Sequence, residues 1–226
     1  FNTESLIDGI VRKNTFMQTH NLSARGGTDK LNFLFSLGYY DKSGVFKIGP
    51  DKNERYNGRL NIGSQLSKYL SLDSRITYTL QKWDAGSRGA SGANGLLYKV
   101  YRERQLQPPF TPEGRYNADA SGYSYALLKD GGYNNQQRNF FDGVFSFKLA
   151  NFVKGLQIRA VTGVKYYDAG SQRFTRTIET WYRTIKSGTL LNNPNSYSVS
   201  REIIKNSNIQ FLADYDFKIG RDHNFH

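Results

Sequence analysis

Residues 29–41, DKLNFLFSLGYYD, alternate between large apolar side chains and small or polar ones. One side of the extended chain carries Leu31, Phe33, Phe35, Leu37 and Tyr39, and the other side is polar or small apart from one leucine. A side-chain period of two predicts a β-strand whose two faces meet different environments. The apolar face could meet either a protein core or the hydrocarbon of a membrane.

Six further segments show the same period, at residues 15–26, 54–66, 70–81, 138–150, 155–168 and 203–217. Each is about a dozen residues long, which exceeds the usual strand of roughly 5–6 residues. It is close to the roughly 9–11 residues that a tilted strand needs to cross a bilayer. The apolar side of the six clearest strands carries no Asp, Glu, Lys or Arg. A lipid-facing surface requires this, because a Lys or Arg there costs about 2–4 kcal/mol near the midplane.

The connections between these segments alternate in length. Residues 26–29, 67–69, 151–154 and 218–222 are short, whereas 42–53, 82–137 and 169–202 are long. In an antiparallel meander this alternation places every short turn at one end and every long loop at the other. Outer-membrane barrels have this arrangement, with periplasmic turns and longer extracellular loops. We therefore predict an all-β fold, an antiparallel transmembrane β-barrel segment with long extracellular loops.

The longest connection is predicted to contain one short loop helix. Leu97, Val100, Tyr101 and Arg104 recur at helical spacing, and Pro108–Pro109 ends the pattern. We expect extended chain through the following TPEGRY.

The chain has 226 residues and a formal net charge of +12, so nucleic acid is a possible partner. Its positive residues are scattered, however, with no Lys/Arg run. The mean hydropathy of −0.64 and the lack of an 18-residue apolar run argue against a transmembrane helix. Cysteine is absent, which excludes disulfides and Cys-based zinc sites. Because the first residue is Phe1 rather than Met, we expect an excerpt of a longer chain.

An ordered series of motifs resembles one family. The series consists of THNLSARGGTDKLNFLFSLGYYDKSGVF, ERYNGRLNIGSQLSKYLSLDSRITYTLQK, PPF…EGRY and FLADYDFKIGRDHNFH. It is similar to barrel hairpins and a loop of SusC/RagA-like TonB-dependent transporters of Bacteroidetes outer membranes. The resemblance implies a roughly 22-stranded barrel around an N-terminal plug. Residues 1–226 would supply about eight strands of that one barrel domain, without the plug or the TonB box.

The resemblance also implies a function and a location. The protein would be a multi-pass barrel in the Gram-negative outer membrane that imports oligosaccharides or peptides, energised through TonB. A SusD-like surface lipoprotein would close over the loops as a lid. The protein would not be an enzyme and would not bind nucleic acid. Two alternatives remain open at this stage: a passive porin or adhesin barrel, and a soluble, basic, β-rich domain that binds glycan or nucleic acid.

No catalytic, metal or cofactor site is predicted. The three histidines lack metal-ligand spacing, and no Ser–His–Asp order or phosphate-binding loop is present. Loop aromatics could stack on sugar rings or peptide side chains, contact the lid, or simply pack within the loops. These candidate substrate- or lid-contacting residues are Trp83, Tyr98, Tyr101, Trp181 and Tyr182.

A second set of candidates carries positive charge on the polar sides of the strands. We expect these residues to face the lumen, where they could guide anionic groups of a substrate or pair with acidic residues of the plug. They are Arg55, Arg59, Arg75, Arg159 and Lys165.

Overall fold

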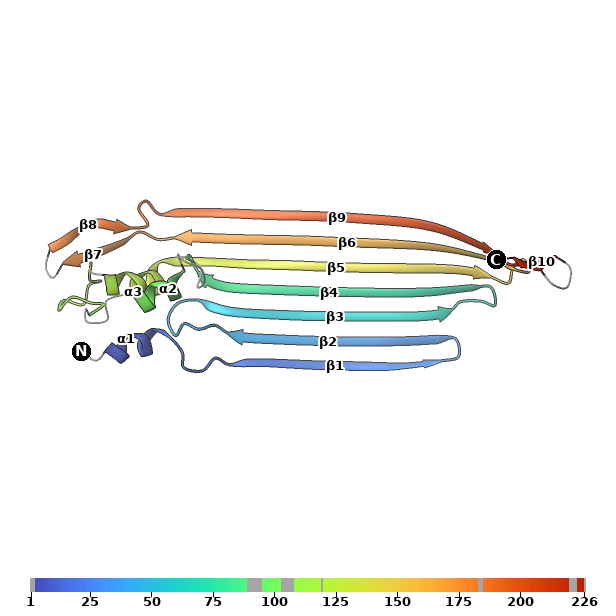
Figure 1. Ribbon diagram of the computed structural model, residues 1–226, viewed down its shortest axis with the longest axis horizontal. Coiled ribbons are helices and arrows are strands. Elements are labelled where there is room, and N and C mark those ends of the chain that lie inside the picture. Colours follow the sequence, from blue (N-terminus) through green and yellow to red (C-terminus); the bar gives the residue numbers. More distant parts are fainter. Residues whose placement is uncertain are drawn as a thin grey trace.

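The computed structural model describes residues 3–88, 95–102, 108–118, 120–182, 185–219 and 223–225. They form a long antiparallel sheet with helices and a small hairpin gathered at one of its ends (Figure 1). The strand order is β1-β2-β3-β4-β5-β6-β9, so each strand pairs with the next along the sheet. The strands of this sheet are β1 Met17–Thr28, β2 Leu31–Ser43, β3 Asp51–Gln65, β4 Leu70–Gly86, β5 Gly132–Ala150, β6 Leu156–Thr175 and β9 Ser196–Tyr215.

Two short hairpins and three helices complete the described chain. The hairpins pair β7 Ile178–Tyr182 with β8 Ile185–Leu191, and β10 Phe217–Ile219 with β11 His223–Phe225. The helices are α1 Thr3–Ile10, α2 Leu96–Arg102 and α3 Ala120–Asp130.

The predicted strands and the sorting of their connections are confirmed. The tight turns after β1, β3 and β5 all lie at one end of the sheet, which we call the turn end (Figure 1). The longer connections after β2, β4 and β6 lie at the opposite end, the loop end, together with all three helices (Figure 1). The antiparallel all-β fold class follows directly from this meander.

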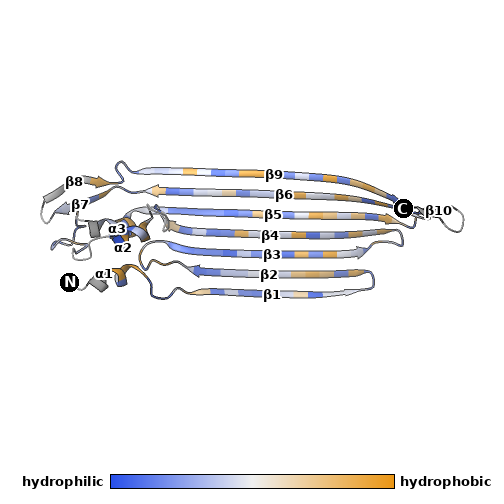
Figure 2. Cartoon of the chain, in the orientation of Figure 1, coloured by the Kyte–Doolittle hydropathy of each residue, from blue (hydrophilic) through white to orange (hydrophobic). Residues whose placement is uncertain are grey.

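The strands extend further toward the loop end than the sequence predicted. β5 has 19 residues, and β6 and β9 have 20 each, against a prediction of about a dozen. Toward the loop end the strands become more hydrophilic (Figure 2). A strand whose two faces both meet polar surroundings loses the apolar–polar alternation by which its end could be recognised.

The cross-strand register places all six predicted apolar sides on a single face of the sheet, the apolar face. Phe33 lies opposite Ile62, Leu60 opposite Ile76, and Leu72 opposite Phe147. We call a row the set of residues that the register places opposite one another from strand to strand. The rows of these pairs continue across β6 to β9. Six patterns found separately in the sequence therefore describe one continuous surface, and the other face of the sheet is the polar face.

The uncharged part of the apolar face forms an oblique band. On β4 it runs from Leu70 to Leu80, about 34 Å of extended chain at roughly 3.4 Å per residue. A tilt of about 40–45° reduces this to about 25 Å, the height of the apolar band of an outer-membrane barrel. On β9 the charged boundary begins at Lys205, which shares a row with Leu37, whereas on β2 it begins four residues later, at Asp41. A boundary that crosses the rows obliquely is expected of strands that tilt relative to the membrane.

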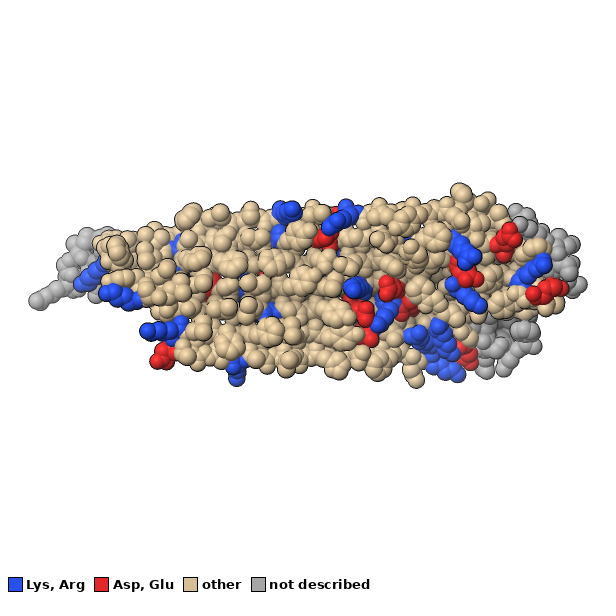
Figure 3. Space-filling view, turned by 180° about the vertical axis from the view of Figure 1, so that it is seen from behind, with Lys and Arg blue, Asp and Glu red and all other residues tan. Residues whose placement is uncertain are grey.

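Charges of the same face gather beyond the band. Figure 3 shows Lys, Arg, Asp and Glu concentrated over the half of the molecule toward the loop end, beside a broad field almost free of charge. Tyrosines mark the loop-side border of this field, at Tyr39, Tyr56, Tyr78 and Tyr166. Aromatic girdles of this kind lie at the interfaces of membrane barrels.

The loop-end helices differ from the prediction. α2 confirms the predicted short helix as far as Arg102, and Arg104 lies outside the described residues. α1 and α3 were not predicted. The expectation of extended chain through TPEGRY is wrong, because this segment turns back at Gly114, where φ is 77°, and a bridge joins Phe110 to Tyr116. A positive φ is unfavourable for most residues with a Cβ, so glycine suits this turn.

The buried core of the described chain lies among these loop-end elements. It joins α1, α2, α3, β7 and the connection between β2 and β3 into one unit, which we call the loop cap. The core of the loop cap consists of Ile10, Phe46, Leu96, Val100, Ala126, Leu127, Leu128 and Ile178. Among the described residues, no helix has the length and hydropathy needed to cross a membrane.

The apolar face can be tested with one pair of neighbouring substitutions. Ile76 lies in the middle of the band, whereas Thr77 lies on the polar face between Arg59 and Asp142, whose charges balance. Ile76→Lys should lower the free energy of unfolding of the protein in phospholipid vesicles by at least about 2–4 kcal/mol, because hydrocarbon does not solvate the ammonium group. Thr77→Lys should change it by less than about 1 kcal/mol. Equal effects of the two lysines would contradict a lipid-facing surface.

Candidate functional site: the polar face and the loop cap

The polar face carries the basic residues predicted to face a lumen. Arg55, Arg59, Arg75, Arg159 and Lys165 all lie on this face, because they alternate with residues of the apolar band. All five are exposed. Only Lys165 has an ion pair in the described part of the chain, with its Nζ 3.7 Å from Oδ2 of Asp142. Arg59 donates from Nε to Oδ1 of Asn61 over 3.4 Å. The guanidinium groups of Arg55, Arg75 and Arg159 keep their donors available for another molecule or another part of the protein.

Arginines near the loop end of this face lie over aromatic rings. The guanidinium carbon of Arg138 on β5 is 4.7 Å from the ring centroid of Trp83 on β4. That of Arg55 on β3 is 5.3 Å from the ring of Tyr40 on β2. Cation–π attraction of this kind is worth about 0.5–1 kcal/mol at an exposed site. The rings therefore orient the two guanidinium groups without neutralising them.

A second group of the polar face supplies neutral hydrogen-bonding and stacking surfaces. Phe140 and Tyr167 form an aromatic pair with their centroids 4.9 Å apart. In the same row the Thr79 hydroxyl donates to Oδ1 of Asn57 over 3.1 Å. Rings that can stack and amides that can form hydrogen bonds therefore lie beside the charged groups of this face.

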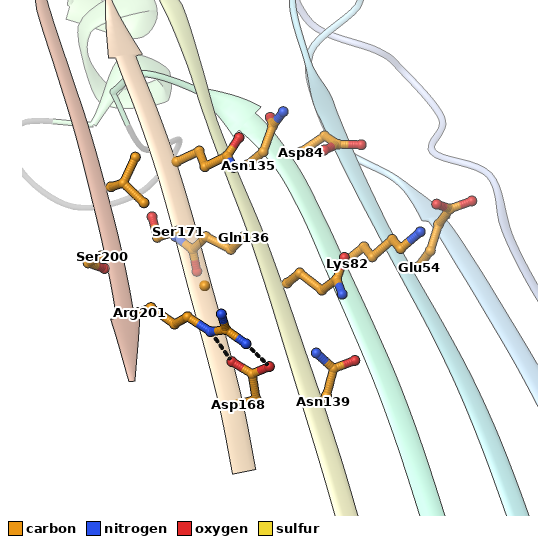
Figure 4. A pocket seen from close by; sticks show the side chains of 14 residues that line it. Glu54, Lys82, Asp84, Asn135, Gln136, Asn139, Asp168, Ser171, Ser200 and Arg201 are labelled. Atoms are coloured by element: carbon orange, nitrogen blue, oxygen red, sulfur yellow. Dashed lines mark hydrogen bonds and ion pairs between the residues drawn. The ribbon is translucent and has the colours of Figure 1, made fainter. Parts of the chain in front are cut away.

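The apolar face has its own polar hollow beyond the band, shown in Figure 4. Glu54, Lys82 and Asp168 approach it from three strands. Arg201 on β9 donates two hydrogen bonds to the Asp168 carboxylate on β6, each 2.9 Å long (Figure 4). Lys52 beside this hollow contacts Glu54 at 2.7 Å and Asp41 at 3.6 Å. The carboxylates of Asp41, Glu54 and Asp168 are thus paired with cations, whereas Asp84, which also lines the hollow, has no ion pair among the described residues.

The loop cap is held by an aromatic and polar cluster as well as by its apolar core. The Tyr116 hydroxyl donates to Oδ2 of Asp130, and the Tyr116 ring contacts those of Phe110 and Tyr125. Partial burial, together with the hydrogen bond to the Asp130 carboxylate, raises the pKa of Tyr116 above its ordinary value. The phenol therefore keeps its proton, and with it this hydrogen bond, throughout the physiological pH range.

The structure separates the five aromatic residues predicted to contact substrate or lid. Trp83 lies on the polar face of the sheet, Tyr98 and Tyr101 lie exposed on α2, and Trp181 and Tyr182 lie on β7. No ring contact joins any two of them within the described ranges.

Two of these aromatics are engaged within the loops themselves. The Trp181 ring lies 3.9 Å from the Arg115 guanidinium carbon, and its backbone nitrogen donates to the Tyr116 carbonyl. Tyr98 accepts a 2.7 Å hydrogen bond from Arg102 one turn later. Tyr101 and Tyr182 are the most exposed of the five, at 56% and 51%.

The polar-face residues near the loop end were only partly identified from the sequence. Tyr40, Arg138, Phe140 and Tyr167 belong to the same surface as Trp83 and Arg55. The alternation along the predicted strand 138–150 could have placed Arg138 and Phe140 on this face, because both lie on the same side of that strand as Asp142. The contact of Arg138 with Trp83 depends on a partner strand more than fifty residues away along the chain.

Among the described residues, no three His, Asp or Glu side chains gather into a group that could hold a metal ion. His226 lies outside the described residues.

The chain has relatives among known proteins, although no family model matches it. It is 27% identical over 154 residues to the TonB-dependent receptor P39 of Formosa agariphila, a match that covers 68% of this chain and 14% of that protein. Among solved structures it is similar to the RagAB peptide importer. The match to the closed-closed state has a TM-score of 0.63 at 18% identity, and the match to the open-open state has 0.64 at 17%. Each covers 97% of this chain and 24% of the other, so the chain spans about a quarter of the length of those chains.

The loop cap provides a prediction that is independent of the sheet. Leu96 is fully buried in the cap, whereas Tyr98, on the same helix, is 45% exposed. Leu96→Ala should destabilise the cap by about 2–5 kcal/mol, because it leaves a cavity in the cap core. Limited proteolysis of the protein in detergent should then cut residues 87–131 at least tenfold faster than in the wild type.

Tyr98→Ala is the matched control and should leave the cleavage rate within about twofold of the wild type. In both variants the strands should stay protected, because the cap core lies beyond them. Loss of strand protection in Leu96→Ala would show that the cap and the sheet do not unfold separately.

Proposed function

We propose that the chain is a segment of the barrel of a SusC/RagA-like TonB-dependent transporter in the outer membrane, and that the whole protein actively imports oligosaccharides or peptides. All of residues 1–226, loops included, would belong to one barrel domain. The protein would bind and move its substrate without reacting with it, so we propose no enzymatic activity and no cofactor.

The observation that carries this proposal is the difference between the two faces of the sheet. One face has a band about 25 Å high without a charged side chain, bordered by tyrosines. The other face carries arginines, lysines, carboxylates and amides at the same height along the strands. A wall with hydrocarbon on one side and a wide aqueous lumen on the other requires this combination.

The edge strands support a larger barrel. β9 is exposed along all 20 of its residues, and in the described chain both β1 and β9 pair on one side only. Long unpaired edges promote aggregation, and closure of a barrel removes them. Neighbouring strands of the whole barrel would pair with both edges, and the solved structures that share this fold have chains about four times as long.

The loop cap supports a partner at the extracellular side. Its core contains no residue of the large sheet, so the cap would present a folded surface above the barrel mouth. We propose that a SusD-like surface lipoprotein closes over this cap as a lid. Exposed aromatics of the cap such as Tyr101 and Tyr182 are candidates for contacting the lid or the substrate. Contact with TonB would be made outside this chain.

Uptake by living cells tests active import against a passive channel. Cells that lack the gene should fail to accumulate the labelled oligosaccharide or peptide on which the wild type grows. Cells that keep the protein but lack TonB function should fail as well, because energised uptake needs both. A tagged copy should also co-purify with a surface lipoprotein from outer-membrane extracts.

Uptake that continues without TonB would instead establish a passive porin. Recovery of the protein in the soluble fraction without detergent would contradict the membrane location altogether. Growth on simple sugars is the control, because it should be the same in all three strains.

A further inference from the structure

Arg55 and Arg138 form a pair of cations at the loop end of the polar face. Both belong to one row, in which Gln81 lies between them on β4. Neighbouring strands lie about 4.8 Å apart, so the two arginines lie about 10 Å apart at the backbone. Their row lies between two rows of the opposite face, that of Tyr39 and Tyr56 and that of Asp41 and Glu54. It is therefore at the mouth of the barrel, just outside the apolar band.

Each guanidinium of this pair is oriented by a ring and lacks a carboxylate. Arg138 lies over Trp83 and Arg55 lies over Tyr40, at the distances given above. Neither has an ion pair or a hydrogen bond to an acidic side chain within the described ranges. In the row of the two arginines and in the row of Trp83, the only other charged residues are Lys42 and Glu202. Glu202 lies two strands beyond Arg138, about 10 Å away.

The opposite face provides an internal comparison at the same height. There Arg201 is held by Asp168, and Lys52 by Glu54 and Asp41. Arg201 and Lys52 on the outside are thus paired with carboxylates, whereas Arg55 and Arg138 on the inside rest on rings without a carboxylate partner. A guanidinium that rests on a ring keeps its planar fork of donors free for a carboxylate, to which it can bind in bidentate fashion.

We propose that Arg55 and Arg138 form a carboxylate-binding site that selects anionic oligomers at the barrel mouth. This inference rests on the proposed function and narrows its substrate class to oligomers with carboxylate groups. The spacing of about 10 Å suits two carboxylates of one extended chain rather than a single one. Gln81 between the two arginines, and Asn57 in the adjacent row, would supply neutral hydrogen bonds to the oligomer backbone.

Carboxylates of this kind occur in oligouronides and in acidic peptides, and matched ligands distinguish the two sources. The first pair of ligands is an oligogalacturonide and the same oligomer with its carboxylates reduced to alcohols. The second pair is an oligoglutamate and an oligoglutamine of equal length. Binding to the full-length protein in detergent, together with any lipoprotein that co-purifies, is measured at low and at high salt.

We expect one of the two acidic ligands to bind at least tenfold more tightly than its neutral counterpart, with a preference that weakens at high salt. Arg55→Gln and Arg138→Gln should each weaken that binding about tenfold or more, and should leave binding of the neutral ligand within about twofold. Lys82→Gln is the matched control. It removes one positive charge from the residue next to Gln81, on the opposite face, and should leave the affinity within about twofold.

The inference is overturned if both acidic ligands bind no better than their neutral counterparts, or if the two arginine variants bind the acidic ligand like the wild type. In either case TonB-dependent uptake of a neutral oligomer would leave the proposed transport function standing. If wild-type cells show no TonB-dependent uptake of any oligomer, the proposed transport function itself is contradicted. Unchanged outer-membrane levels and heat-modifiable migration of each variant show that its barrel is folded.

Discussion

The antiparallel hydrogen-bond register determines which side chains share a face, and the rest of the structure depends on it. Every pair in the large sheet runs through without an interruption, and among the described pairs a register shift occurs only between β7 and β8. A slip by one residue would exchange the two faces of a strand. On β3, for example, such a slip would place Arg59 among the leucines and phenylalanines of the apolar band. The cost of a charge in hydrocarbon therefore helps to specify the register, which backbone hydrogen bonds alone do not fix.

The same cost explains which parts of the fold the sequence could predict. The central strands could be recognised because one face has to exclude charge and the other does not, and this difference leaves a period of two in the sequence. Beyond the band both faces are polar, so the residues of β5, β6 and β9 nearest the loop end carry no such pattern. α3, with the sequence ASGYSYALLKD, contains Gly, Ser and Tyr, which are weak helix formers. It forms because Ala126, Leu127 and Leu128 are buried in the cap, and such a contact cannot be inferred from a local pattern.

The candidate site was predictable to a smaller extent than the strands. The alternation of side chains along each strand placed the five basic residues on one face, but it could not show which of them lie beside an aromatic ring. The association of Arg138 with Trp83, and that of Arg55 with Tyr40, depends on which residues the register makes neighbours across strands. Cation–π contacts add little to stability at exposed sites. Their main consequence here is orientation, because they limit the conformers of long side chains that would otherwise lose entropy on meeting a ligand.

The separation of the cap core from the sheet has a consequence for how a barrel of this kind can be gated. A lid that closed on disordered loops would have to order them, and that lost conformational entropy would be subtracted from the energy of closure. A cap that already buries Ile10, Leu96 and Val100 is ordered before any partner arrives. Closure of the proposed lid would then occur between two folded surfaces and would leave the polar face beneath open to the proposed substrate. Because the cap core is built from loop residues, it can change with the substrate without disturbing the strands that cross the membrane.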